Sequence, residues 1–278
     1  MLNLLVSKPY MTNGLVEYWD SNRSHIRMIV DSGAFTNWKA GKVTSVDEYM
    51  AFIDGLPVKP WGYFTLDRIG DPITTKDNYQ AMISNGFDPI PIFTRGTPIS
   101  ELDSLYEQNE VVGIGVGVGT NNYLGYLKHV VEQNRGRNLH WLGVANPSMI
   151  ANYKPYSCDA SSWESGGRYG SIQVYQGGGK FITYRRQHAS TRPPDPTMWR
   201  LIRSLGYDPK MLQQEDSWRG GESVSRRLGC ASWVRYILDV EQRFNTKVFL
   251  ALATPQAIRQ CVDEYLKATN VRPVKVTA

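Results

Sequence analysis

Short apolar runs recur along this chain, and many of the stretches between them carry apolar residues at intervals of three and four positions. Apolar runs of about four to eight residues are typical of buried strands in a parallel sheet, whereas apolar residues at intervals of three and four positions are typical of amphipathic helices. The run that ends at Asp31 is of the first kind, and the alternation of apolar residues with glycine from Val111 to Gly119 also predicts a strand. The predicted strands are residues 3–7, 26–31, 63–67, 89–94, 111–119, 138–145, 156–159 and 247–253.

Capping residues mark the starts of several predicted helices. The sequence Ser45-Val-Asp-Glu48 is a capping box. Asn146-Pro147 and Thr254-Pro255 each combine an N-cap residue with a proline at the first helical position. Besides a short segment after residue 146, the predicted helices are a segment after residue 45, residues 74–83, 100–107, 123–132, 199–205 and 223–244, and a segment after residue 254.

Strand and helix alternate about seven times, at a spacing of roughly 25–40 residues. This alternation predicts an α/β fold of parallel βαβ units, and the length fits a single (β/α)8 TIM-like barrel over residues 1–278. A doubly wound open sheet is the alternative. The regularity stops after Trp163, so residues 164–245 are predicted to be an elaboration of the barrel that begins with a β-hairpin and continues with helices.

Composition restricts the class of protein. The apolar fraction of 41% and the charged fraction of 21% are those of a soluble globular protein. Apolar runs are too short for a membrane span and the start of the chain lacks the features of a signal peptide, so a cytoplasmic location is expected. The three cysteines are far apart and show no zinc spacing, which argues against a disulfide framework or a zinc site and predicts that no cofactor is needed.

The net charge of +5 comes mainly from the last third of the chain, where basic residues outnumber acids and aromatic residues lie among them. This pattern favours phosphate neutralisation with base stacking over its alternative, a solvated basic face. Gln176 is a further candidate for filling the gap in an opened base stack. The predicted nucleic-acid contacts are Lys180, Arg185, Arg186, Arg192, Trp218 and Arg219.

Three predicted strands end in an acid: Asp31, Asp67 and Asp159. The carboxyl ends of the strands of a parallel barrel share one mouth, where active sites lie. Carboxylates gathered there repel one another, so the pKa of at least one should be raised, which suits a nucleophile paired with an acid/base. The alternative is that each acid only caps the loop that follows it, as Asp159-Ala-Ser-Ser162 suggests on local grounds.

Five motifs resemble, in the same order, motifs of the tRNA-guanine transglycosylase family. They cover roughly residues 26–165, and their order and spacing make the resemblance more specific than any one of them. The motifs are Asp31-Ser-Gly-Ala-Phe35, Phe64-Thr-Leu-Asp67, Val112-Gly-Ile-Gly-Val-Gly117, His140-Trp-Leu-Gly-Val-Ala-Asn-Pro147 and Ser157-Cys-Asp159.

The resemblance implies a barrel that exchanges guanine for a 7-deazaguanine by double displacement. Asp159 would attack the sugar C1′ and form a covalent glycosyl intermediate, while Asp31 would shuttle protons. Asp67 would hold the N1–H and 2-amino edge of the purine. Of the other implied contacts to the base, Ser32 would bond the base or support Asp31, and Phe35 and Leu142 would sandwich the ring. The region of Gly113 and Gly115 would supply backbone contacts, and Gly143 is a further base-binding residue.

The chain also departs from the family pattern. Arg95 stands where the family has a glutamine, and the Cys-x-Cys-x-x-Cys zinc signature is absent. These departures make the chain more similar to the DNA 7-deazaguanine transglycosylases (the DpdA group) of phages and bacterial modification islands. The implied partners are double-stranded DNA, with tRNA as the runner-up, and a free base such as 7-cyano-7-deazaguanine.

Two further hypotheses remain at this stage: a barrel glycosidase that transfers the sugar to water, and a non-catalytic nucleic-acid-binding barrel. The first would release free base without needing a deazaguanine. The second would keep the basic segment but would not need Asp159.

Overall fold

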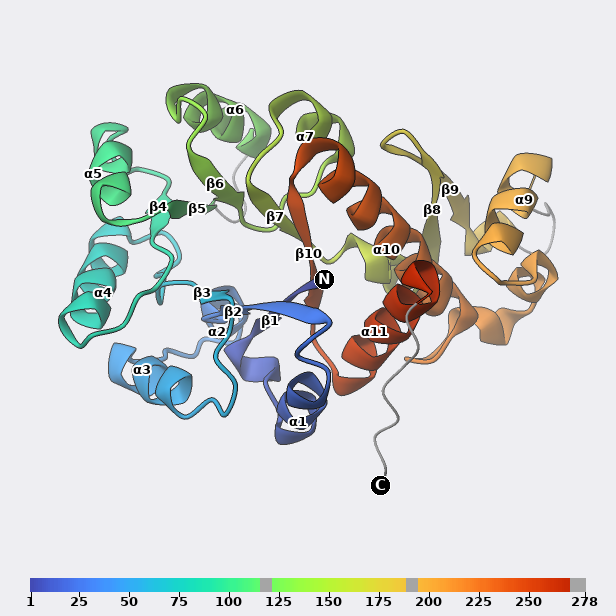
Figure 1. Ribbon diagram of the computed structural model, residues 1–278, viewed down its shortest axis with the longest axis horizontal. Coiled ribbons are helices and arrows are strands. Elements are labelled where there is room, and N and C mark those ends of the chain that lie inside the picture. Colours follow the sequence, from blue (N-terminus) through green and yellow to red (C-terminus); the bar gives the residue numbers. More distant parts are fainter. Residues whose placement is uncertain (116–121, 189–194, 271–278) are drawn as a thin grey trace.

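The computed structural model describes residues 1–115, 122–188 and 195–270. Within these residues, eight strands form one curled sheet in which all the paired strands are parallel (Figure 1). Their order across the sheet is β3-β2-β1-β10-β7-β6-β5-β4. The strands are β1 (Leu2–Ser7), β2 (Ile26–Asp31), β3 (Gly62–Tyr63), β4 (Ile92–Thr94), β5 (Val111–Gly115), β6 (Asn138–Trp141), β7 (Ser157–Ala160) and β10 (Lys247–Leu252).

This strand order is consistent with a TIM-like fold. The first strand pairs with the last, and strand numbers then fall steadily from β10 to β4. In the classic doubly wound order the numbers rise outward from the first strand on both sides, so that alternative does not describe this sheet. The predicted α/β class with a parallel sheet is therefore confirmed.

The two outermost strands, β3 and β4, approach each other at one point. Phe64, next to β3, forms an isolated parallel bridge with Ile90, just before β4. The Ile90 amide donates to the Tyr63 carbonyl at 2.8 Å, and the Thr65 amide donates to the Ile90 carbonyl at 3.0 Å. Pro89 and Pro91 flank Ile90 and have no N–H to donate, which explains why regular pairing in β4 starts only at Ile92.

Helices connect most of the strands and cover the outer face of the sheet (Figure 1). The predicted caps form: Ser45 Oγ accepts the amide of Glu48 at 3.1 Å, and Asn146 and Thr254 cap their helices in the same way. The helices are α1 (Asn13–Ser21), α2 (Ala34–Lys39), α3 (Val46–Asp54), α4 (Pro72–Ser84), α5 (Ser100–Gln108), α6 (Tyr123–Gln133), α7 (Pro147–Tyr153), α10 (Val224–Phe244) and α11 (Pro255–Thr269). The sequence did not predict α1 and α2.

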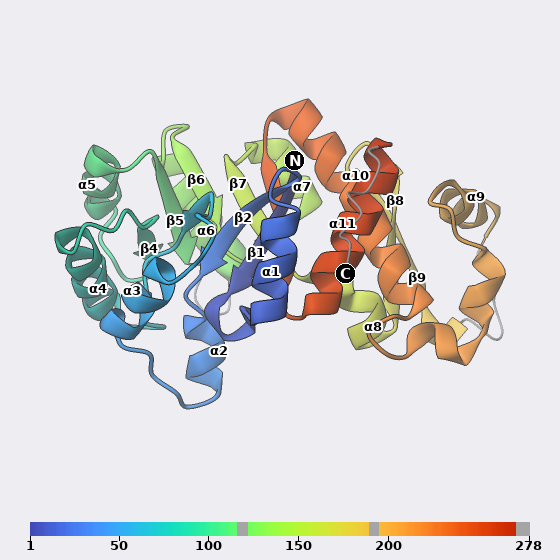
Figure 2. The same cartoon turned by 60° about the horizontal axis from the view of Figure 1, so that its bottom comes forward.

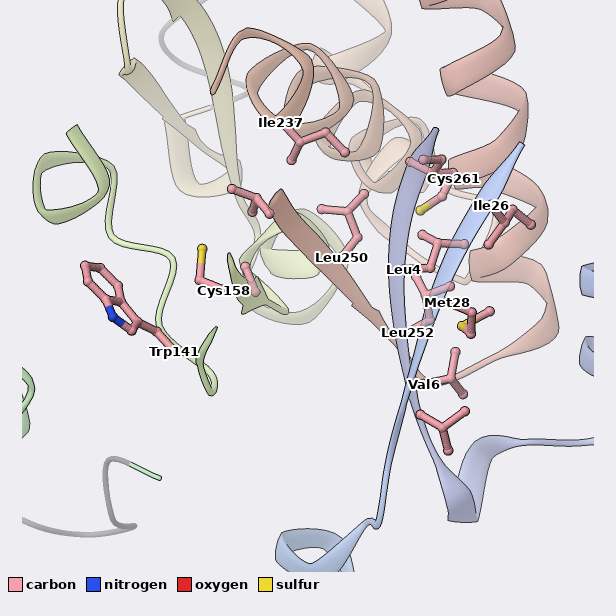
Figure 3. Packing of buried hydrophobic residues seen from close by; sticks show 14 of the residues in the cluster. Leu4, Val6, Ile26, Met28, Trp141, Cys158, Ile237, Leu250, Leu252 and Cys261 are labelled. Atoms are coloured by element: carbon pink, nitrogen blue, oxygen red, sulfur yellow. The ribbon is translucent and has the colours of Figure 1, made fainter. Parts of the chain in front are cut away.

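Side chains alternate between the two faces of the sheet, as the period of a strand requires. Leu4 of β1 and Leu250 of β10 point to the outer face, toward Ile237 of α10 and Cys261 of α11 (Figure 3). A second, smaller apolar cluster fills the inside of the curled sheet. It is made of Leu5, Ile29, Phe64, Ile92 and Phe249, with Ile90, Leu142 and Ala251 packed against it.

The segment between β7 and β10 forms a separate lobe beside the sheet (Figures 1 and 2). It contains α8 (Ser165–Tyr169), the antiparallel pair β8 (Ser171–Gly177) and β9 (Lys180–Arg185), and α9 (Pro196–Ser204). The lobe has its own apolar cluster, which includes Ile172, Val174, Met198 and Ile202.

Helix α10 belongs to both parts of the molecule. Leu228 and Ala231 pack in the lobe cluster, whereas Trp233 and Ile237 pack in the main core. The elaboration predicted over residues 164–245 therefore includes a helix whose buried face completes the main core. Of the described helices, none has the length and apolar content that crossing a membrane would require.

Candidate active site

A cavity of about 580 Å³ opens at the carboxyl ends of the strands. This volume lies within the range typical of small-molecule sites. All three acids predicted from the strand ends line it. The lining residues are Leu5, Ser7, Asp31, Phe35, Thr36, Asp67, Ile69, Gly70, Ile92, Thr94, Arg95, Gly115, Leu142, Gly143, Asp159 and Ala251.

Asp159, on β7, is fixed through one of its two carboxylate oxygens. Its Oδ1 accepts the amide of Gly143 at 2.7 Å and lies 3.3 Å from Nε2 of His140. Gly143 adopts a left-handed φ of 70°, a conformation that favours glycine, and this aims its N–H at the acid. Oδ2 of Asp159 forms no hydrogen bond with a described residue, so this oxygen is free to react in the cavity.

His140 is a site residue for which no role was predicted from the sequence. It is fully buried on β6, opposite Ser157 of β7, and its Nδ1 lies 2.8 Å from Ser157 Oγ. Ser157 therefore holds the ring at Nδ1, while Nε2 faces Asp159. Strand alternation could have indicated it, because His140 of β6 lies two residues before Leu142, which follows the strand and lines the cavity.

Asp31, the last residue of β2, is held in a similar way to Asp159. Its Oδ2 accepts Ser7 Oγ–H at 2.7 Å and the Gly33 amide at 3.0 Å, whereas Oδ1 has no hydrogen bond to a described residue. Burial raises the pKa of Asp31, and the charge of Asp159 raises it further, against the two hydrogen bonds. Asp31 is thus suited to carry a proton beside Asp159. The sequence did not indicate Ser7.

Asp67 follows β3 at a distance of four residues rather than ending it as predicted. The intervening segment is anchored, because Tyr49 Oη–H donates to the Phe64 carbonyl at 2.9 Å and Asn78 Nδ2 donates to the Leu66 carbonyl at 2.8 Å. Burial and the charge of Asp31 raise the pKa of Asp67 to about 7. Asp67 therefore titrates near neutral pH, as expected for carboxylates gathered at one mouth.

Two predicted contacts require correction. Ser32 is fully buried and donates to Asp67 Oδ1 at 3.0 Å, so it supports Asp67 rather than Asp31 and does not line the cavity. Gly113 is covered as well: a Cβ built on it would lie 3.1 Å from the ring of Phe64. Gly113 therefore makes room for the inner apolar cluster. Gly115, the next glycine of β5, lines the cavity, whereas Gly113 does not. Gly117, in the same predicted strand, lies outside the described residues.

The walls of the cavity include both residues that were predicted to sandwich the base. Phe35 of α2 and Leu142 both line it, and Phe35 is 39% exposed. Arg95 brings a cation to the cavity and lies with its guanidinium 5.5 Å from the centre of the Tyr126 ring. An acidic floor with an apolar wall and a cation at the rim is suited to a flat, polar-edged heterocycle.

A second, wider groove of about 960 Å³ lies in the lobe and contains several predicted nucleic-acid contacts. Arg185 and Arg186 line it, together with Arg168 and Tyr169 of α8. Arg186 and Arg219 both pair with Glu215, whereas Arg185 forms no ion pair with a described residue. Lys180 is exposed at the start of β9, and Arg192 lies outside the described residues.

Trp218 has a structural role in place of the predicted stacking role. Its side chain is only 3% exposed, packs with Ile172 and Leu212 in the lobe cluster, and donates Nε1–H to the Leu212 carbonyl at 2.8 Å. Although Trp218 is among the residues that line the groove, so little of its side chain is exposed that its ring is not available for stacking on a base. Gln176 is exposed, in β8.

The groove and the cavity lie toward the same end of the molecule. Helix α2, which follows β2, and helix α8, which follows β7, both lie at the lower edge of the view in Figure 2. Phe35 of α2 lines the cavity and Tyr169 of α8 lines the groove.

The described residues contain no cluster of three or more His, Cys, Asp or Glu side chains placed to hold a metal ion. In comparisons with known proteins, no family model, curated protein or solved structure matches this chain. The relation to transglycosylases therefore remains a prediction from the motifs and the site.

Proposed function

We propose that this protein is a transglycosylase that exchanges guanine in DNA for a 7-deazaguanine base, through a covalent intermediate on Asp159. The observation that carries the proposal is the single cavity lined by Asp31, Asp67 and Asp159, in which Asp31 and Asp159 each keep one oxygen free of hydrogen bonds with described residues. We further propose that the sheet is a closed (β/α)8 barrel, with the bridge between Phe64 and Ile90 as its last seam.

The proposed reaction has two displacements at the sugar C1′. In the first, Oδ2 of Asp159 bonds to C1′, the bond from C1′ to N9 of guanine breaks, and Asp31 gives its proton to the departing base. In the second, N9 of the incoming deazaguanine bonds to C1′, its proton passes to Asp31, and the ester to Asp159 breaks. Asp31 ends with its proton restored, and no water is consumed.

Duplex DNA adds a requirement, because a carboxylate in a cavity does not reach C1′ of a stacked nucleotide. The target guanine must therefore be flipped out of the helix. In this proposal Arg185 and Arg186, which line the groove, and the exposed Lys180 hold phosphates of the bound DNA. The raised pKa of Asp31 supports its part as the acid.

The direct test is incorporation of labelled guanine into DNA and into tRNA, measured side by side with the purified protein. The proposal expects incorporation into DNA and none with the Asp159→Asn variant. Incorporation into tRNA alone would favour the tRNA enzyme. Release of free base without incorporation would favour a glycosidase, and binding without either reaction would favour a non-catalytic barrel.

The His140 ring is expected to act as a positioning group for Asp159. In His140→Ala, the acid keeps only the Gly143 amide and is free to rotate, so kcat should fall by about 10- to 100-fold with little change in KM. His140→Gln retains a side-chain donor and should recover part of the rate. Equal rates in wild type and His140→Ala, with both proteins folded, would show that the contact has no part in the reaction.

The groove in the lobe is expected to bind nucleic acid through phosphate contacts. Arg185→Ala should flatten the slope of log affinity against log salt by about 0.9 for each phosphate that is no longer neutralised, as a salt titration with duplex DNA would show. Glu215→Gln should have the opposite effect, since it releases Arg186 and Arg219 from their shared acid. Arg23→Ala is the matched control, because this exposed arginine precedes β2 at the far ends of the strands. An unchanged slope in Arg185→Ala would exclude the groove as the site of phosphate contacts.

A further inference from the structure

The rim of the cavity carries two exposed aromatic side chains on one short helix. Phe35 and Trp38 of α2 are 39% and 52% exposed, and their rings stack with centroids 6.2 Å apart and an interplanar angle of 21°. Large apolar side chains exposed together beside a cavity are unusual for a monomer and mark a contact surface. Nothing in the described fold requires the Trp38 ring at this position.

Trp38 lies at the boundary between two hollows. Phe35 lines the cavity that contains the three acids, whereas Trp38 lines a neighbouring hollow of about 460 Å³. Asp67 and Ile69 line both hollows. The stacked pair of rings therefore extends along the rim from the cavity to the neighbouring hollow.

The charge around this pair suits a polyanion. Lys39 lies with its Nζ 4.3 Å from the centre of the Phe35 ring, and Lys42 and Arg68 are exposed beside the same hollow. Two acids line this hollow: Asp71 caps α4 through Thr74, and Asp67 accepts from Ser32 and also lines the cavity. A flat apolar surface with cations around it fits stacked bases flanked by phosphates.

We propose that Trp38, backed by Phe35, is a wedge that enters the DNA stack where the target guanine has left it. This inference rests on the proposed function. A flipped base leaves an unpaired partner and two exposed base faces, and an apolar ring inserted there restores stacking to them. In this arrangement Phe35 contacts the flipped guanine inside the cavity, and Trp38 contacts the base that stays in the duplex.

The wedge is needed only when the DNA is double-stranded, and this gives a specific test. Exchange of labelled guanine is measured on one plasmid preparation, native and heat-denatured, with wild type, Trp38→Ala and Trp38→Phe. In Trp38→Ala the ratio of the native to the denatured rate should fall by about 10- to 100-fold relative to wild type, the value of one base–aromatic stack. Trp38→Phe should recover most of that ratio.

Trp61→Ala serves as the control, because this tryptophan is 40% exposed but precedes β3, away from the mouth. An unchanged ratio in Trp38→Ala, or an equal fall in rate on both forms of the DNA, would overturn the wedge and leave the transglycosylase proposal intact. If wild type fails to exchange on either form, or exchanges on tRNA alone, both the wedge and the DNA proposal fall.

Discussion

Replacing Asp159 by asparagine is expected to abolish base exchange, with a fall in rate of at least about 10³-fold, while the protein stays folded. The amide cannot form the ester with C1′, because it is a poor nucleophile. Its oxygen can still accept the Gly143 amide that now bonds Oδ1, so the local structure has a reason to persist. This is the largest effect that the site predicts.

The covalent intermediate gives a second readout for the same variant. Wild type incubated with DNA in the absence of a free base should form a protein–DNA adduct that survives denaturing electrophoresis, and Asp159→Asn should form none. Asp195→Asn is a matched control, since Asp195 caps α9 through the amides of Thr197 and Met198 and asparagine caps helices equally well. Exchange by Asp159→Asn at the wild-type rate would eliminate Asp159 as the nucleophile.

The placement of Asp31 and Asp159 in one cavity could be predicted because strand alternation is a local property. The apolar runs before each acid determine which residues face outward, and this leaves the acids on the inner face at the strand ends. The third acid was less predictable. Proline-flanked Ile90 pairs with the segment around Phe64 for only a few residues, so the chain carries Asp67 to the cavity as a loop.

Interactions between residues distant in sequence account for what sequence patterns missed. Ser32 adjoins Asp31, yet it bonds Asp67, whereas the partner of Asp31 is Ser7 on the neighbouring strand. Basic and aromatic composition likewise does not distinguish an exposed tryptophan from a buried one. Trp218 is enclosed because β8, α9 and α10 meet around it, and only the assembled lobe defines that core.

Two of the helices that the sequence did not predict, α1 and α2, illustrate the same limit. Helix α2 is only six residues long and begins after Gly33, which has a left-handed φ of 76°, without a side-chain cap. Helix α1 also lacks a side-chain cap hydrogen bond and buries only Leu15 and Trp19. Helices this short and without side-chain caps cannot be distinguished from loops by sequence patterns. Helix α2 nevertheless carries both aromatic side chains of the rim.

Changing Asp67 to asparagine is expected to remove guanine exchange and, at the same time, to stabilise the protein at alkaline pH. The N1–H and 2-amino groups of guanine are donors and need the ionised carboxylate as acceptor. With a pKa of about 7, Asp67 is ionised above that pH, so kcat/KM for wild type should rise with pH through about 7. It should fall again at the pH where Asp31 loses the proton that it gives to the departing base. In Asp67→Asn the rate should be at least about 10²-fold lower, because an amide presents an N–H to a donor edge.

The stability effect follows from the same raised pKa. The folded state holds a proton on Asp67 up to about pH 7, whereas the unfolded chain releases it near the ordinary value of 3.8. Between these values the folded state binds more protons, so the contribution of Asp67 to the free energy of unfolding falls as pH rises and is constant above about 7. Asp67→Asn removes this penalty and should raise the free energy of unfolding by roughly 1–3 kcal/mol at pH 8, with little change at pH 4.

Denaturant melts at pH 4, 6 and 8 test this stability change on the whole protein. Asparagine keeps an oxygen that can accept from Ser32, so the variant removes the buried charge without removing that hydrogen bond. Asp77→Asn is the control, since this exposed acid on α4 forms no ion pair or hydrogen bond with a described residue and should not alter the pH dependence. If Asp67→Asn is less stable than wild type at pH 8, the ionised carboxylate does not destabilise the folded state, and the predicted stability change is wrong. If the variant is more stable but exchanges guanine at the full rate, Asp67 does not take part in base recognition.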